Sequence, residues 1–307
     1  MVQLTREETR GRVRRVAAAL TGRHPAGLAF SAPYVVFVAT VFAYPLGLAV
    51  WMSFHRYIFT APGVSVPRPF VGLANYAAVL SDPAVRQAFG NIIVLLVINV
   101  PLTVVFSLVL ATALNSVIPF RRFFRVSYYL PYVTASVAVV GVWLFMFDSG
   151  GIVNNLLGPL APSPSWLINA HLAMPSIAVY VTWKQLGFYI LLYLAALQNV
   201  PKELYESAAV DGASWWRSFR SVTVPSVRPA TTLVVLLSLI TGANLFTEPY
   251  LLTGGGGPAG ASTSPVLLIY QDGIEQNHPD IAATIGLLLV AGVLIVSVIN
   301  RWFLERD

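Results

Sequence analysis

The 307-residue sequence contains no cysteine and few charged residues. Without cysteine, disulfide bonds and thiolate-ligated metal sites are excluded. The four histidines, His24, His55, His171 and His278, lie far apart and show no metal-ligand spacing. Only 10% of the residues are charged and 56% are hydrophobic, whereas charged residues make up about 25% of an ordinary soluble protein. We therefore expect an integral membrane protein whose polar surface is confined to loops.

Long apolar runs fill much of the chain, and a helix needs about 20 apolar residues to cross a membrane. The arginine-rich residues 1–27 predict a solvated amphipathic helix at the membrane surface. A signal peptide is disfavoured, because the next apolar run exceeds the roughly 7–15 residues of a signal sequence. The sequence predicts a membrane domain over 28–303, with spans at about 28–54, 88–114, 128–147, 171–199, 230–252 and 281–303, and a C-terminal segment, 304–307.

Positive charge is divided unevenly between the segments that connect these spans. With a cytoplasmic N-terminus, the inside segments carry 15 lysines and arginines and the outside loops carry three. One further cation, Lys184, lies inside the fourth span. Cytoplasmic loops carry the excess of Lys and Arg, so both termini are predicted to be cytoplasmic. The net charge of +6 thus reflects membrane topology, and no nucleic-acid partner is expected.

One of the most charged segments of the chain is 201–229, between the fourth and fifth spans. Its pattern predicts a helix, a glycine and a second short helix. Glu203 suits the positive end of the first helix, and Gly212 ends it. Asp211 is placed to cap the second helix through the Ser214 amide. The distribution of cations puts this segment in the cytoplasm.

The same segment resembles the EAA loop of ABC-importer permeases. The family pattern is Glu-Ala-Ala, two residues, Asp-Gly, nine residues, and an ending of hydrophobic, any, hydrophobic and Pro. Here Glu206-Ser207-Ala208 is followed at the family spacing by Asp211-Gly212 and by Val222-Thr223-Val224-Pro225. Ser207 replaces the usual alanine. A helical hairpin at the membrane surface, without a partner, is the alternative interpretation.

Further segments match the carbohydrate and polyol branch of this family, from about residue 30 to the end. They include Phe70–Tyr76, Arg122–Arg125 with the following Leu130-Pro131-Tyr132, and Leu252–Pro258, which has one glycine more than the family's LTGGGP loop. The resemblance implies an all-α integral membrane protein with six transmembrane helices, a cytoplasmic coupling-helix loop at 200–229 and the type I ABC importer permease fold.

The resemblance also implies that the helix of the EAA loop docks into a cleft of an ATP-hydrolysing subunit. A short helix in a partner's groove needs a face of small side chains, and Ala208 and Ala209 supply one. Glu206 offers a carboxylate to a cation of the partner, and Gly212 permits a sharp turn. The candidate coupling residues are Glu203, Glu206, Ser207, Ala208, Ala209, Asp211, Gly212 and Pro225.

Lys184 lies near the middle of the fourth predicted span, where an ammonium group is costly and indicates a functional site. Val181, Gln185 and Phe188 lie at helical spacing on the same face. A cation, an amide and an aromatic ring suit a hydroxylated or an anionic small molecule, and the resemblance places this region on the translocation pathway. A structural ion pair, with Glu248 or with a partner subunit, is the alternative.

The fifth predicted span carries a second group of candidate pathway residues. Small residues at spacings of three and four also serve close helix packing, so both interpretations stay open. Glu248-Pro249 lies near the outer end and is also a candidate gate or kink. The candidates are Ser238, Thr241, Gly242, Asn244, Leu245 and Glu248.

No ATP-binding motif is present: no Lys-Ser or Lys-Thr follows the Gly254–Gly257 run. We therefore expect no cofactor on this chain, and ATP and magnesium on partner ATPase subunits. The resemblance implies import of a sugar or related polyol by alternating access, across the inner membrane of a prokaryote. Its implied partners are a second homologous permease, two ATPase subunits and an extracytoplasmic substrate-binding protein that docks on loops 55–87, 148–170 and 253–280.

Two other classes of protein compete with this prediction. A stand-alone secondary transporter or channel is expected to show inverted internal repeats, and no segment has a clear second copy. An intramembrane enzyme needs a catalytic constellation, and the sequence contains no His-Glu-x-x-His motif and no nucleophile–base pair.

Overall fold

The computed structural model describes residues 25–116 and 120–304, and these residues form helices joined by loops, with no β-strand among them. They divide into two compact units, one that ends at Met52 and one that begins at Ser53. The surface helix predicted over 1–27 lies almost wholly outside the described residues, as does most of the predicted C-terminal segment.

The first unit is one long apolar helical segment. It consists of α2 (Pro25–Val38), a π-helical turn η1 (Ala39–Ala43) and α3 (Tyr44–Ser53). Phe30–Ser53 is long and apolar enough to cross a membrane. Its large side chains are exposed, including Phe37 and Phe42. The segment matches the first predicted span.

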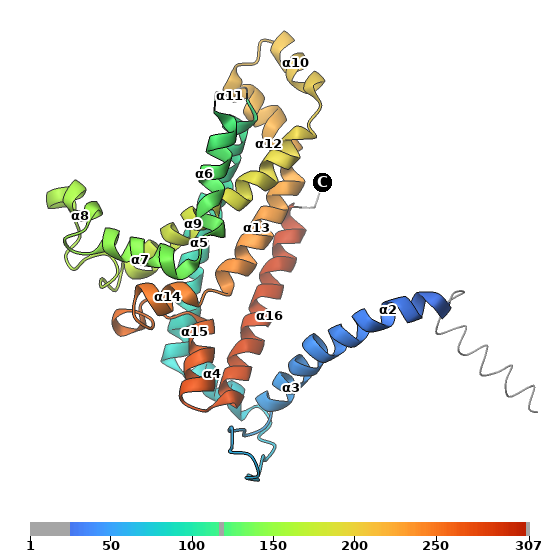
Figure 1. Cartoon of the computed structure of the whole chain (residues 1–307), viewed down its shortest axis with the longest axis vertical. Coiled ribbons are helices and arrows are strands. Elements are labelled where there is room, and N and C mark those ends of the chain that lie inside the picture. The colour runs from blue at the N-terminus through green and yellow to red at the C-terminus, as the bar shows by residue number, and fades with distance from the viewer. Residues whose placement is uncertain (1–24, 117–119, 305–307) are drawn as a thin grey trace, which may run out of the picture. The chain divides into compact units, whose positions relative to one another are not determined.

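Two long helices, α5 (Pro83–Asn115) and α9 (Ala173–Gln198), pack along each other in the second unit (Figure 1). Asp82 caps α5, because its Oδ1 accepts a hydrogen bond from the Ala84 amide at 2.8 Å, and Pro83 occupies the first turn, where its missing N–H is tolerated. Three tyrosines of α9 are almost fully buried in the interior: Tyr180, Tyr189 and Tyr193. These helices correspond to the second and fourth predicted spans.

The third predicted span, 128–147, is broken in the structure. α6 (Arg121–Val133) ends at Thr134, and both the amide and the hydroxyl of Thr134 bond to the Leu130 carbonyl. A second helix, α7, then begins, and the membrane-length apolar stretch runs from Ser136 to Leu160. It contains α7 (Ser136–Phe147), α8 (Ile152–Leu157) and the 3₁₀ turn η2 (Gly158–Leu160).

The fifth predicted span, 230–252, is also interrupted. α13 (Arg228–Ala243) ends at Asn244, whose amide and side-chain Nδ2 both donate to the Ile240 carbonyl, at 3.2 and 2.8 Å. α14 (Thr247–Leu252) follows this break. The sixth span is the unbroken α16 (Pro279–Leu304), and the segment before it contains η4 (Pro258–Gly260), α15 (Pro265–Tyr270) and the π-helical turn η5 (Gln271–Glu275).

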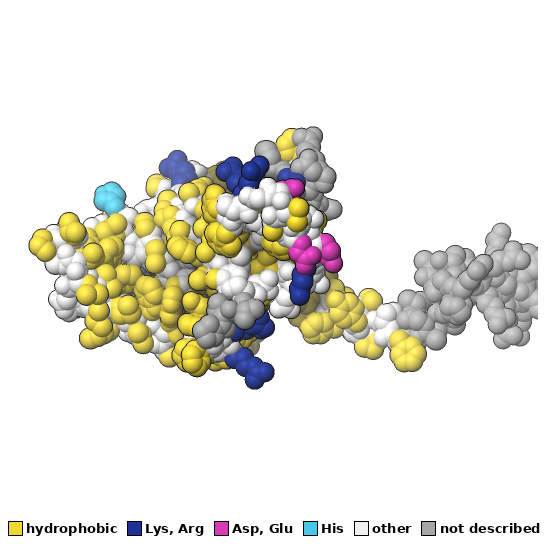
Figure 2. Space-filling view, turned by 90° about the horizontal axis from the view of Figure 1, so that it is seen from above, with side chains coloured by type: hydrophobic (Ala, Val, Ile, Leu, Met, Phe, Trp, Pro, Cys, Tyr) yellow, Lys and Arg dark blue, Asp and Glu magenta, His cyan; other side chains and the backbone are white. Residues whose placement is uncertain are grey.

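The short connecting elements of the second unit lie at the two ends of its helix bundle. The short α4 (Ala74–Ser81) and α15 lie at one end, and α10 (Lys202–Val210) and α11 (Trp215–Ser218) lie at the other (Figure 1). Seen from the α10 end, basic side chains are visible between hydrophobic ones (Figure 2). The elements at this end are α10 (Lys202–Val210), α11 (Trp215–Ser218), the π-helical turn η3 (Phe219–Thr223) and α12 (Val224–Ser226).

Candidate functional site

The predicted helix–glycine–helix segment is present at the α10 end. α10 ends in two backbone bonds that turn the chain, from Gly212 N to Ala209 O at 3.0 Å and from Ala213 N to Ala208 O at 2.9 Å. This is a Schellman ending, which requires a left-handed residue, and Gly212 has φ +71°. The glycine therefore sets the direction in which the chain leaves α10.

The capping arrangement differs from the prediction for Asp211. Ser214 caps α11, because its Oγ accepts a hydrogen bond from the Arg217 amide at 3.4 Å. Asp211 instead ends α10, and its amide donates to the Ser207 carbonyl at 3.0 Å. The prediction was wrong because the glycine turn takes two residues, which moves the start of α11 beyond the reach of Asp211.

The surface of α10 is open, and none of its residues is buried. Ala208 is half-buried, and the other seven candidate coupling residues are exposed. Two apolar side chains that the sequence argument overlooked share this surface, Leu204 at 47% and Val210 at 88% exposed. Their signal in the sequence is weak, because single apolar residues are common on helices. Together these residues form a small-residue and acidic surface with apolar edges.

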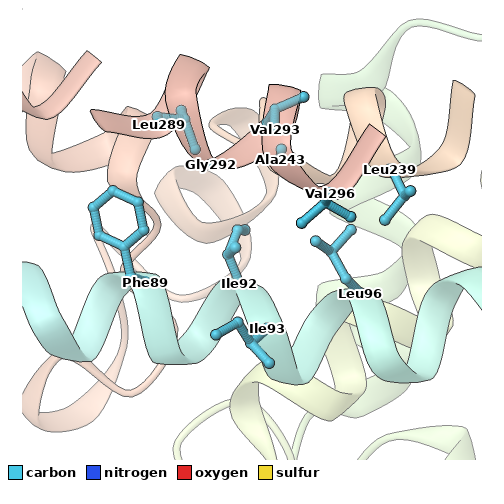
Figure 3. A pocket seen from close by; sticks show the side chains of 10 residues that line it. All are labelled: Phe89, Ile92, Ile93, Leu96, Leu239, Ala243, Leu289, Gly292, Val293 and Val296. Atoms are coloured by element: carbon cyan, nitrogen blue, oxygen red, sulfur yellow. The ribbon is translucent and has the colours of Figure 1, made fainter. Parts of the chain in front are cut away.

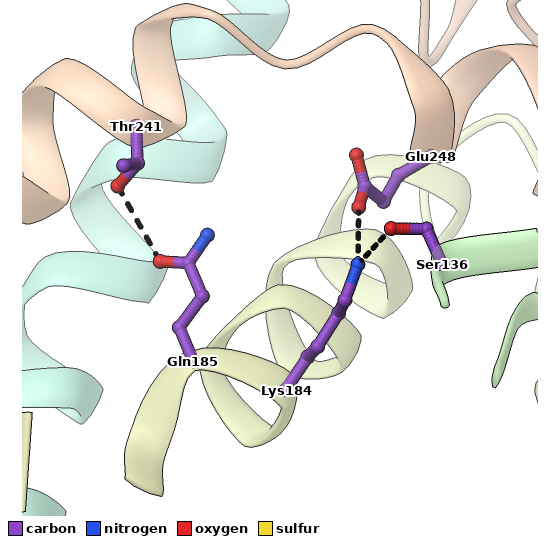
Figure 4. Close-up of polar contacts among 5 residues, drawn as sticks. All are labelled: Ser136, Lys184, Gln185, Thr241 and Glu248. Atoms are coloured by element: carbon purple, nitrogen blue, oxygen red, sulfur yellow. Dashed lines mark hydrogen bonds and ion pairs between the residues drawn. The ribbon is translucent and has the colours of Figure 1, made fainter. Parts of the chain in front are cut away.

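The second site lies within the spans, where Lys184 of α9 meets Glu248 of α14. Lys184 Nζ lies 3.6 Å from Glu248 Oε1, and it also donates a hydrogen bond to Ser136 Oγ of α7 (Figure 4). The side chains of the lysine and the glutamate are only 13% and 12% exposed. The ion pair that the sequence left as an alternative is thus present, and together with the Ser136 hydrogen bond it links α7, α9 and α14.

A neutral polar contact lies next to this ion pair. Thr241 Oγ1 of α13 donates to Gln185 Oε1 of α9 at 3.4 Å (Figure 4). The same oxygen lies 3.3 Å from the Tyr189 hydroxyl. Thr241 and the nearby Asn244 are exposed. Polar groups on the outside of a membrane-spanning helix need a polar or aqueous neighbour.

An aromatic pair extends this surface toward α6. The ring of Phe188 stacks on that of Tyr132, with centroids 5.0 Å apart and planes inclined by 15°. Sequence reasoning identified Phe188 but missed Tyr132 and Ser136, since both come from the broken third span. We name the set Ser136, Lys184, Gln185, Phe188, Tyr132, Thr241, Asn244 and Glu248 the polar face.

The remaining pathway candidates are packed inside the bundle. Val181 and Leu245 belong to one buried apolar cluster, with 1% and 4% exposure. Ser238 is buried and donates to the Val235 carbonyl of its own helix at 3.0 Å. Gly242 lies against α5, where an added Cβ would come within 2.6 Å of a Leu96 methyl group. Their position suits helix packing, and their assignment to a pathway stays a prediction.

An apolar pocket of about 180 Å³ lies between α5, α13 and α16 (Figure 3). Phe89 and Ile92 of α5 line it together with Leu239 of α13 and Val293 of α16. Each of the ten residues around it is apolar or glycine, so the pocket provides no side-chain hydrogen bond for a hydroxylated ligand. The polar face is therefore the better candidate.

Comparisons with known proteins agree with this arrangement. Residues 76–306 match the family described as "Binding-protein-dependent transport system inner membrane component". The arabinooligosaccharides transport system permease protein AraP of Bacillus subtilis is 34% identical over 276 residues, which cover 88% of this chain and 86% of AraP. The lactose transport system permease protein LacF of Rhizobium radiobacter is 31% identical, over 88% of this chain and 91% of LacF.

Two further proteins extend the comparison. The sn-glycerol-3-phosphate transport system permease protein UgpA of Yersinia pestis is 30% identical, over 89% of this chain and 92% of UgpA. A crystal structure of a bacterial ABC transporter involved in the import of the acidic polysaccharide alginate has a TM-score of 0.76 and 23% identity, over 93% of this chain and 97% of that chain. The chain therefore belongs to the family of inner membrane components of binding-protein-dependent transport systems, and it has the type I fold of ABC importer permeases.

Proposed function

We propose that this chain is the permease subunit of an ABC importer that carries a sugar or a related polyol into the cytoplasm by alternating access. The observation that carries the proposal is the exposed α10, whose small-residue surface has the EAA spacing and ends in a left-handed Gly212. The relatives named above are transport permeases for sugars or a polyol phosphate. A stand-alone transporter or channel has no use for such a docking surface.

One side-chain contact and the covalent chain join α10 to the polar face. The Tyr205 hydroxyl of α10 lies 3.1 Å from Thr223 Oγ1 of η3. η3 continues into α12, and the helices on either side of Val227 are bent by 69°. α13 then carries Thr241, and Glu248 follows across the break after Asn244. When an ATPase subunit moves α10, this path transmits the movement to the polar face.

The partners that we propose bind to exposed surfaces at the two ends of the helix bundle and at the polar face. Two ATPase subunits bind ATP and magnesium and dock at the α10 end, which is cytoplasmic because seven described basic residues gather there, at 121–125, 202 and 217–228. A second, homologous permease covers the exposed Thr241 and Asn244, since six spans form half of such a transporter. The chain lies in the inner membrane of a prokaryote, with both termini cytoplasmic.

The opposite end has the form of a platform for a substrate-binding protein. Phe59 N donates to Asn277 Oδ1 at 2.8 Å, and Asn277 Nδ2 donates back to Phe59 O at 3.1 Å. Gln87 Nε2 also donates to the Ala259 carbonyl of the glycine-rich loop at 2.8 Å. These bonds join loops 55–87 and 253–280 into one surface, which suits docking better than separate flexible loops.

The test is purification of the whole importer with Glu206→Lys. A positive charge on α10 repels the cation that Glu206 is proposed to meet, so we expect the ATPase subunit to be lost while the permease remains in the membrane. Glu275→Lys makes the same charge change on an exposed residue at the opposite end, and the ATPase subunit should be retained. If Glu206→Lys leaves both co-purification and uptake unchanged, α10 is not the coupling helix.

A further inference from the structure

Between the charged ends of the described spans lie two formally charged side chains, Lys184 and Glu248. The other charged residues of these helices stand near their ends, for example Arg86 in α5 and Asp280 in α16. Since Lys184 and Glu248 have opposite signs, the pair carries no net charge. Their 3.6 Å separation shows that the two charges compensate each other directly.

The environment makes this compensation effective. The two side chains are nearly nine-tenths buried, so water screens their interaction only weakly. A hydrogen bond to Ser136 holds the ammonium group on its other side. Each charge of the pair thus has an opposite charge beside it, and removal of one partner leaves the other uncompensated.

The groups around the pair suit hydroxyls and sugar rings. Gln185 and Thr241 provide an amide and a hydroxyl, and Phe188 and Tyr132 provide stacked aromatic rings. Neutral hydrogen-bonding groups and ring faces bind a polyhydroxylated molecule without requiring a charge. An anion at this surface meets the Glu248 carboxylate together with the Lys184 ammonium group, so the ion pair offers it no net attraction.

We propose that the Lys184–Glu248 ion pair excludes anions from the pathway, so that this permease carries an uncharged polyhydroxylated substrate. The proposal rests on the proposed function, because it takes the polar face as part of the pathway. It refines the sequence prediction, in which Lys184, Gln185 and Phe188 suited a hydroxylated or an anionic small molecule. The sequence offered Glu248 as one possible partner of Lys184, and the structure shows the two groups 3.6 Å apart.

The experiment measures equilibrium binding of two trisaccharides to the whole importer in nanodiscs, without nucleotide or binding protein. The neutral probe is arabinotriose and the anionic probe is trigalacturonate. Wild type should bind arabinotriose more tightly than trigalacturonate. Glu248→Gln leaves the Lys184 ammonium uncompensated, so trigalacturonate should bind at least about tenfold more tightly than to wild type, in a salt-dependent way.

Two matched variants separate charge from shape. Glu248→Asp keeps the carboxylate, and Lys184→Gln combined with Glu248→Gln restores neutrality, so neither should gain affinity for trigalacturonate. If the wild-type importer binds trigalacturonate more tightly than arabinotriose, this result alone overturns the proposal. Absence of the gain in Glu248→Gln also overturns it. If Glu206→Lys does not release the ATPase subunit, only the role proposed for α10 is contradicted. The ratio of the affinities for arabinotriose and trigalacturonate does not depend on that result.

Discussion

Gly187 of α9 lies directly against the backbone of Tyr128 in α6, and a Cβ on Gly187 would overlap the Tyr128 carbonyl oxygen. Small residues permit such close helix approach in membranes, where packing is a main source of helix association. The contact holds α6 beside α9 one turn away from the point where Tyr132 stacks on Phe188. It thereby positions part of the polar face.

We expect Gly187→Ala to lower the thermal stability of the purified importer. The atoms in the way belong to backbone, which cannot rotate aside, and overpacking of this kind costs about 1–3 kcal/mol. Gly141→Ala in α7 is the control, because no atom lies within 4 Å of its Cβ position. Equal melting temperatures for the two variants would show that α6 and α9 separate without cost.

Gly212 offers a test of backbone conformation alone, since a Cβ there meets no atom within 4 Å. Gly212→Ala places a side chain at φ +71°, which costs roughly 1–2 kcal/mol. Gly212→Asn should cost less, because asparagine adopts this conformation more readily. Retention of the ATPase subunit should therefore decrease from wild type to Asn to Ala. The reverse order for Asn and Ala would contradict a conformational role.

Asn99 and Thr182 form a buried hydrogen bond between α5 and α9. Asn99 Nδ2 donates to Thr182 Oγ1 at 2.9 Å, while Asn99 Oδ1 has no partner among the described residues. Asn99→Leu removes the unpaired oxygen together with the hydrogen bond to Thr182. The free energy of unfolding should therefore fall by only about 0.6 kcal/mol, the average for such hydrogen bonds in membranes. Thr182→Val leaves a second buried group poorly paired and should cost about 1–3 kcal/mol. Thermal unfolding of both variants checks the order, which equal melting temperatures would contradict.

Asp272 makes stability depend on pH at the end opposite α10. Burial, and next the negative charge of Asp82, raise the pKa of its carboxyl above the ordinary 3.8, while His278 opposes this effect. The folded protein therefore holds this proton more tightly than the unfolded chain. Stability should rise as pH falls through the raised pKa toward 3.8 and should be lowest above that window.

The matching prediction is that Asp272→Asn raises the melting temperature at pH 7 and removes this part of the pH dependence. The amide has nearly the shape of the carboxyl but no charge to bury. Glu275→Gln, an exposed neighbour in the same turn, should change neither quantity. A lower melting temperature for Asp272→Asn at pH 7 would show that the carboxylate has a stabilising partner.

The long helices and the helix–glycine–helix segment around Gly212 followed from local sequence patterns, because each depends on residues that are close in sequence. Apolar length predicted the helices observed as Pro83–Asn115 and Ala173–Gln198 to within a few residues. The EAA spacing placed the turn at Gly212 correctly for the same reason. The breaks at Thr134 and Asn244 were missed, because the hydrogen bonds that end these helices leave no periodic signal in the sequence.

The sequence by itself determined the membrane-protein class, the approximate spans and the helix–glycine–helix segment around Gly212, since hydropathy and turn chemistry act over a few consecutive residues. Only the tertiary structure decided which charges and rings meet. Lys184, Glu248 and Ser136 come from three helices, and their contact depends on where α14 restarts and how closely α6 and α9 approach. Helix packing sets these distances, and packing depends on side chains that are remote in sequence.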